Sequence, residues 1–236
     1  MRSGVFASAD EGVFVSLDQE DLADAVQRAF SFKKRDHKDW QTQFKRGLSN
    51  SDRDDFKVER YGCIGEQAFH ILTGLPIDRK VRRFGNRFDF AASGVKCKIE
   101  VKIAMRYPEY EIGKFRPKEF DGRIFGYDFF CDKFYLKAKD DKRTSKSFLP
   151  LNADVYVFSV AEFLAPNDLN PIEGSVQFIG WILQGKLDKF KEVGPGVKSG
   201  SVHLNYYIHR KYLSSMTTFL QKFRKGFNES SCGLFI

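Results

Sequence analysis

Asp89, Glu100 and Lys102 have the types and the spacing that metal-assisted chemistry on a phosphate would need. They lie in two stretches that alternate between apolar and polar residues, as strands do, joined by a turn near residues 93–96. Glu100 and Lys102 share one face of the second strand, because side chains two residues apart point the same way. A four-residue loop would pair residue 89 with residue 100 and bring their Cβ atoms to about 5 Å. Other turn lengths would shift this register by one or two residues.

Two carboxylates this close repel each other unless a cation lies between them. Mg²⁺ accepts hard oxygen ligands, here Asp89, Glu100, the Val101 backbone carbonyl and waters. The Lys102 ammonium would position or activate the attacking water, and phosphodiester hydrolysis needs both a metal and a positive group. The hairpin therefore predicts a Mg²⁺ site, with Mn²⁺ as a substitute metal.

The acid-x-Lys pattern is weak by itself, because it occurs at several places in this chain. The occurrences are Asp36/Lys38, Asp55/Lys57, Asp78/Lys80, Glu100/Lys102 and Asp140/Lys142. Only the pair at 100 and 102 lies in an alternating run that follows an Asp-Phe strand. The alternative interpretation is an exposed strand with a surface ion pair of little energetic value.

Hydrophobic spacing predicts helices over residues 16–32 and 56–72, with Ser16 or Asp18 as the cap of the first. Alternating segments predict strands at 81–90, 95–105, 153–160, 176–183 and 202–208. Residues 128–139 fit either a helix or a ragged strand. We therefore expect an α/β or α+β fold around one mixed sheet, compact as a single domain.

The chain is basic, with 39 Lys and Arg against 31 Asp and Glu in 236 residues and a net charge of +8. A basic balance suggests a polyanionic partner. The side chains that we expect to contact phosphates are Lys139, Lys142, Arg143 and Lys146, with Arg82, Arg83 and Arg87 as a second set. The alternative for the first set is a solvated loop.

Other chemistries find little support in the sequence. There is no cysteine or histidine pair at zinc spacing, and no HExxH, P-loop, GxGxxG or GxSxG motif. No apolar run approaches the ~18–20 residues of a membrane span. The scattered cysteines predict free, mostly buried thiols in a reducing cytoplasm: Cys63, Cys97, Cys131 and Cys232.

The segment GCIGEQAFHILTGLP at residues 62–76, followed by the hairpin, resembles the PD-(D/E)XK nuclease superfamily. In that family a glutamate on the first core helix faces the metal site, an acid ends the second strand, and an acid-x-Lys lies on the third. The matching positions here are Glu66, Asp89, Glu100 and Lys102. Phe88 stands where the family name has proline. The resemblance covers roughly residues 55–185.

The resemblance implies a restriction-endonuclease-like α/β core, with a central mixed β-sheet flanked by helices. We expect this core at residues 51–185, an N-terminal helical extension at 1–50 and a C-terminal strand extension at 186–236. Glu66 would bind a second metal or hold a metal-bound water. The alternative for Glu66 is a solvated helix residue or a pair with His70.

The implied activity is that of a Mg²⁺-dependent endodeoxyribonuclease that leaves 5′-phosphates on double-stranded DNA, in the cytoplasm of a bacterial or phage-infected cell. The alternatives are a junction resolvase, a repair nickase or an exonuclease of the same fold, and a non-catalytic DNA-binding module. Cutting both strands symmetrically needs two sites, and hence a homodimer or a monomer that acts twice.

Overall fold

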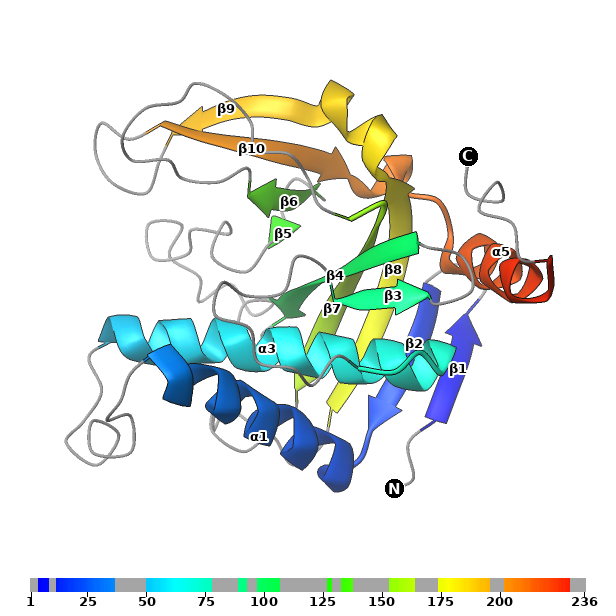
Figure 1. Cartoon of the computed structure of the whole chain (residues 1–236). Helices are drawn as coiled ribbons and strands as arrows, with labels where there is room; N and C mark the ends of the chain where they lie inside the picture. Colours follow the sequence, from blue (N-terminus) through cyan, green and yellow to red (C-terminus); the bar gives the residue numbers. More distant parts are fainter. Residues whose placement is uncertain are drawn as a thin grey trace.

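The strands form two sheets, and helices cover one face of the larger sheet (Figure 1). The computed structural model describes residues 4–8, 12–36, 50–77, 89–92, 97–106, 127–128, 133–137, 153–163, 174–195 and 202–229. The α-helices are α1 (Gln19–Asp36), α3 (Asn50–Thr73) and α5 (Met216–Glu229). Two 3₁₀ segments, η2 (Gln184–Phe190) and η3 (Arg210–Tyr212), follow strands β8 and β10.

The larger sheet has six strands in the order β1-β2-β8-β7-β4-β3. Along this order the strands are Gly4–Ser8, Gly12–Leu17, Gly174–Leu183, Val155–Phe163, Cys97–Arg106 and Phe90–Ala92. Only the β4–β7 pair of this sheet is parallel, so the sheet is mixed, as predicted. The smaller sheet is antiparallel in the order β5-β6-β10-β9. Its strands are Tyr127–Asp128, Lys133–Lys137, Val202–His209 and Lys191–Pro195.

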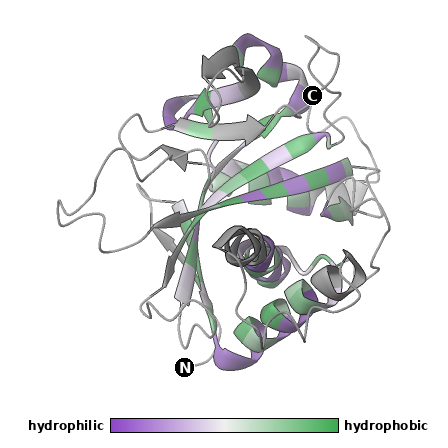
Figure 2. Cartoon of the chain, turned by 90° about the vertical axis from the view of Figure 1, so that its left-hand side faces the viewer, coloured by the Kyte–Doolittle hydropathy of each residue, from purple (hydrophilic) through white to green (hydrophobic). Residues whose placement is uncertain are grey.

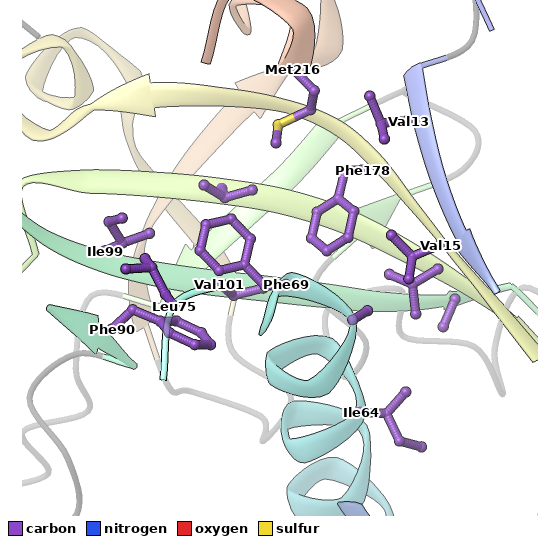
Figure 3. Packing of buried hydrophobic residues seen from close by; sticks show 14 of the residues in the cluster. Val13, Val15, Ile64, Phe69, Leu75, Phe90, Ile99, Val101, Phe178 and Met216 are labelled. Atoms are coloured by element: carbon purple, nitrogen blue, oxygen red, sulfur yellow. The ribbon is translucent and has the colours of Figure 1, made fainter. Parts of the chain in front are cut away.

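Each face of the larger sheet has its own hydrophobic core. On one face, side chains of α3 and α5 pack on the sheet, and Phe69 of α3 contacts Phe90 and Phe178 (Figure 3). Phe69 also contacts Phe219 of α5. On the other face, residues of the smaller sheet and η2 pack on β7 and β8. We call these the helix-side core and the small-sheet core. Helix α1 lies on α3, which is seen end-on in Figure 2 inside the curve of the larger sheet.

Both predicted helices are confirmed, with different ends. Helix α1 starts at Gln19 because the Asp18 carboxylate accepts hydrogen bonds from the backbone N–H groups of Glu20 and Asp21, at 3.0 and 3.1 Å. Helix α3 starts at Asn50, earlier than predicted. It ends before Gly74, whose φ of 74° is a left-handed conformation that favours glycine.

A β-bulge in β8 keeps the apolar side chains on the correct faces. Val176 and Phe178 face the helix-side core, and after the register shift opposite Phe158/Ser159 the odd-numbered Trp181 faces it as well. One extra residue in a strand inverts its alternation in this way. The chain after η3 then approaches β8 closely, and Trp181 bridges to Ser214. A Cβ on Gly180 would lie 2.7 Å from the Ser214 carbonyl oxygen.

Gly180→Ala should therefore destabilise the fold. The new methyl group would also meet the Leu213 Cβ at 2.8 Å, so backbone must move, and overpacking costs about 1–3 kcal/mol. The measurement is the free energy of unfolding from urea titrations. Gly185→Ala is the matched control, because a Cβ there meets no atom within 4 Å. Equal stability of the two variants would contradict the close approach.

The structure differs from the sequence-based expectations at four places. Its strands form two sheets, where one mixed sheet was expected. The first 50 residues, expected as a helical extension, also contribute β1 and β2 to the larger sheet. Residues 128–139, which fitted helix or strand, form strand β6 at 133–137. The C-terminal extension, expected as strands, ends in helix α5, whose apolar side chains complete the helix-side core.

Two of the four cysteines lie in the described residues. Cys63 and Cys97 are buried, as predicted, and burial raises the pKa of the Cys63 thiol, with the nearby Glu66 charge adding to the rise. Cys131 and Cys232 lie outside the described residues. Among the described helices, none combines the length and the apolar character that crossing a bilayer requires.

Candidate functional site

The predicted register of the hairpin is confirmed. Strands β3 and β4 pair Phe90 with Ile99, Ala91 with Lys98, and Ala92 with Cys97. Asp89 immediately precedes β3, and its backbone N–H donates to the Ile99 carbonyl at 3.1 Å. The start of the edge strand thus brings Asp89 beside the Glu100 segment of β4.

The side chain of Asp89 is anchored on the backbone of β4. Its Oδ2 accepts a hydrogen bond from the Val101 N–H at 2.7 Å. In a strand the N–H and C=O of one residue face the same neighbour, so the Val101 carbonyl is directed to the side on which Asp89 lies. A carboxylate and a backbone carbonyl oxygen therefore meet at this sheet edge.

Glu100 and Lys102 form an ion pair on the small-sheet face of β4. Lys102 Nζ lies 2.5 Å from Glu100 Oε1, and the two side chains are 39% and 19% exposed for Lys102 and Glu100 respectively. In the parallel register Glu100 lies beside Tyr156 of β7 and Lys102 beside Phe158, both residues of the small-sheet core. The pair is therefore partly exposed to solvent, although its neighbours in β7 are buried.

The charges of this group act on one another. Burial raises the pKa of Asp89 well above its usual value, and the negative charges of Glu100 and Glu66 raise it further. The Lys102 ammonium and the Val101 N–H act in the opposite direction. For Lys102, desolvation lowers the pKa, but the charges of Glu100 and Asp89 outweigh it and raise the pKa overall. The site thus brings together more carboxyl groups than its one lysine can pair with.

Glu66, on α3, lies near enough to interact electrostatically with Glu100 and Asp89. Gly65 lets the helix lie close to β4, because a Cβ there would be 3.1 Å from the Ile103 Cβ. Glu66 is 18% exposed, and burial raises its pKa to about 7 despite the opposing charge of Arg28. Glu59 and Glu100 add to the rise. Neither alternative in the sequence analysis, a solvated residue or a pair with His70, describes Glu66.

The partner of Glu66 is Arg28, which the sequence analysis did not single out. Arg28 Nη1 lies 2.8 Å from Glu66 Oε2, and its Nη2 donates to the Cys63 carbonyl at 2.8 Å. Its Nε pairs with Asp24 at 3.2 Å. The side chain is only 8% exposed. In the sequence, Arg28 could have been noticed as a charged residue among the apolar positions of α1, where an uncharged side chain would be expected.

The oxygen donors of this site suit a divalent cation such as Mg²⁺ when waters complete its coordination. In the part of the chain that the structure describes, no three carboxylate, imidazole or thiol groups gather closely enough to hold a metal ion among themselves. The oxygens available are those of Asp89, Glu100 and the Val101 carbonyl, with waters completing the shell. Glu66 has one oxygen committed to Arg28, so it suits a water-mediated role better than a direct one.

The residues that we expected to contact phosphates cannot be placed. Arg82, Arg83, Arg87, Lys139, Lys142, Arg143 and Lys146 all lie outside the described residues. Their role stays a prediction.

No family model, no curated protein and no solved structure matches the chain.

Proposed function

We propose that the chain is a Mg²⁺-dependent endodeoxyribonuclease with a restriction-endonuclease-like core. The observation that carries the proposal is the position of Asp89, whose half-buried carboxylate is fixed on the Val101 N–H beside the Glu100–Lys102 pair. The negative charges of Glu100 and Glu66 raise the pKa of Asp89, and carboxylates this close favour a cation between them. The basic net charge supports a substrate rich in phosphates.

Each side chain has a role in this proposal. Asp89, Glu100 and the Val101 carbonyl would hold Mg²⁺, which supplies Lewis-acid polarisation of the phosphate when bound. The Lys102 ammonium, held in place by Glu100, positions the attacking water and balances the negative charge that develops on the phosphate oxygens. Glu66, held by Arg28, orients a further water. Hydrolysis then breaks the P–O3′ bond and leaves a 3′-hydroxyl on one new end and a 5′-phosphate on the other.

The proposal is tested by incubating supercoiled plasmid with the purified chain in Mg²⁺, and in parallel in EDTA. We expect nicked and linear products only with Mg²⁺, and 5′-phosphates at the new ends by end-labelling. Binding of the plasmid without cutting in either condition would indicate the non-catalytic module instead. Cutting that persists in EDTA would contradict the role of the metal.

Lys102→Ala should lower the cleavage rate about 10²–10³-fold, the usual loss when a group that stabilises a developing anion is removed. Mg²⁺ affinity should change little, because an ammonium is not a metal ligand. Lys98→Ala is the matched control, since Lys98 is exposed on the same face of β4, two residues before Glu100. Initial rates on plasmid at saturating Mg²⁺ measure the effect. Equal losses in the two variants would show that general positive charge, and not the position of Lys102, supports cutting.

A further inference from the structure

A second group of basic side chains surrounds an exposed tyrosine where η2 and η3 meet. Segment η2 supplies Lys186 and Lys189, and η3 supplies Arg210, Lys211 and Tyr212. We call these five residues the η2–η3 surface. The two segments lie side by side at the ends of β8 and β10, at the top of Figure 1. Only the fold brings these distant parts of the sequence together.

Tyr212 forms an aromatic platform at the centre of this surface. It is 50% exposed, one of only two large hydrophobic side chains exposed to this degree in the described residues. The Tyr212 ring packs on buried Phe190, with 5.2 Å between the ring centroids, and this contact holds the Tyr212 ring in place. An anchored and half-exposed ring can accept a flat partner with little loss of conformational entropy.

Two lysine ammonium groups lie close to the Tyr212 ring. Lys211 Nζ lies 5.1 Å and Lys189 Nζ 5.7 Å from the Tyr212 ring centroid. With Lys186 and Arg210 the surface carries four positive charges, and Asp188 is the one acid within the two segments, so the local charge is +3. Ammonium groups next to an aromatic ring match the alternation of phosphates and bases along a nucleic-acid strand.

The η2–η3 surface lies on the same face of the larger sheet as part of the candidate site. Leu187 and Phe190 of η2 belong to the small-sheet core. So do Tyr156 and Phe158, which lie beside Glu100 and Lys102 in the sheet. A strand bound at η2–η3 would therefore not have to cross the sheet to reach the Glu100–Lys102 pair.

We propose that the η2–η3 surface binds unpaired DNA, with one base stacked on Tyr212 and the adjacent phosphates paired with Lys189 and Lys211. The inference rests on the proposed function in taking DNA as the partner. Unpaired nucleotides fit better than a duplex, because the faces of paired bases are covered by their neighbours in the stack. A duplex would engage the lysines but leave the Tyr212 ring without a partner.

Fluorescence anisotropy in EDTA tests the inference, because binding is then measured without hydrolysis. The probes are a labelled oligothymidylate of about 12 nucleotides and a hairpin duplex of similar charge. Tyr212→Ala should weaken oligothymidylate binding about 5- to 100-fold, the range for losing one stacked base. Tyr212→Phe should bind as the wild type does, because it keeps the ring. Duplex affinity should change much less in both variants.

The lysines are tested by the salt dependence of binding. Replacing Lys189 and Lys211 together by Ala should lower the log–log slope for oligothymidylate by about 1.4, at about 0.7 for each phosphate contact on a single strand. Lys222→Ala is the matched control. Its Nζ also lies over an aromatic ring, 5.7 Å from the Trp181 centroid, but Trp181 belongs to the helix-side core on the opposite face. The slope should not change in this variant.

The inference is overturned if the wild type does not bind oligothymidylate, if Tyr212→Ala binds it unchanged, or if Lys222→Ala loses as much as the double variant. Failure of the proposed function would be visible separately in the plasmid experiment. If the chain binds oligothymidylate through Tyr212 but never cuts DNA, the η2–η3 binding site is supported and the nuclease activity is contradicted. If the chain cuts DNA with Mg²⁺ but Tyr212→Ala does not change oligothymidylate binding, the nuclease activity is supported and the η2–η3 binding site is contradicted.

Discussion

Asp89→Asn and Glu100→Gln should each lower Mg²⁺-dependent cleavage by about 10³-fold or more. Both substitutions keep the size of the side chain but remove the charge that would hold the metal. Metal assistance contributes several kcal/mol to stabilising the transition state, and each ~1.4 kcal/mol corresponds to a factor of ten in rate. Asp89 should be the more sensitive, because the Val101 N–H fixes its orientation and little else can take its place.

DNA binding in EDTA and the fold should survive both substitutions, so the loss belongs to the chemical step. A second readout is stabilisation by Ca²⁺ or Mg²⁺ in thermal unfolding, which the wild type should show and the two variants should lack. Asp154→Asn is the matched control. Its carboxylate also accepts a hydrogen bond from a β4 backbone N–H, that of Lys98 at 2.8 Å, but it is exposed and lies at the start of the neighbouring β7. If Asp89→Asn cuts at the wild-type rate while Asp154→Asn does not, the site has been assigned to the wrong carboxylate.

The hairpin could be predicted from the sequence because its information is local. Alternation decides which residues share a face, and the loop length decides the register. The pairs from Phe90–Ile99 to Ala92–Cys97 follow from these two quantities alone. The position of Asp89 beside Glu100 followed for a four-residue loop, and the structure selects that register from the others that the sequence allowed.

The surroundings of the hairpin could not be predicted in the same way. Arg28 and Glu66 are 38 residues apart, and their contact depends on how α1 packs on α3, which no local pattern encodes. The strand at Gly12–Leu17 does alternate between half-buried and buried residues. Its partner β8, however, lies more than 150 residues later, so its place in the larger sheet is a property of the whole topology.

The bulge in β8 shows a further limit of pattern reading. Strict alternation from Val176 would place Trp181 on the small-sheet face, but the extra residue returns it to the helix-side core. Around the bulge, residues 178–183 are all apolar or glycine, because both faces of the sheet are covered there. This part of the strand carries no alternation that could reveal a bulge.

Arg28→Met should destabilise the chain by about 3–5 kcal/mol, the cost of removing one partner of a buried ion pair. The variant keeps an apolar stem of similar length but leaves Glu66 without its cation and the Cys63 carbonyl without its donor. Urea titrations measure the loss. Asp24→Asn is the control, because that carboxylate is 28% exposed and its pair with Arg28 lies within one helix, where such pairs contribute well under 1 kcal/mol.

The pH dependence separates the ion pair from simple loss of packing. In the wild type burial raises the pKa of Glu66 to about 7, and Arg28 limits the rise, so removing Arg28 should raise this pKa further. Between the pKa of Glu66 in the unfolded chain and its higher pKa in the folded state, the folded state binds the proton more tightly. The free energy of unfolding therefore falls as pH rises through this range, and the range is wider when the folded pKa is higher. The loss caused by Arg28→Met should be larger at about pH 8 than at about pH 6, where Glu66 is mostly protonated in both folded proteins. In the Glu66→Gln background the loss should no longer depend on pH between these values. A loss that is independent of pH in both backgrounds would show that Arg28 stabilises the α1–α3 contact by packing, and that the charge of Glu66 is balanced elsewhere.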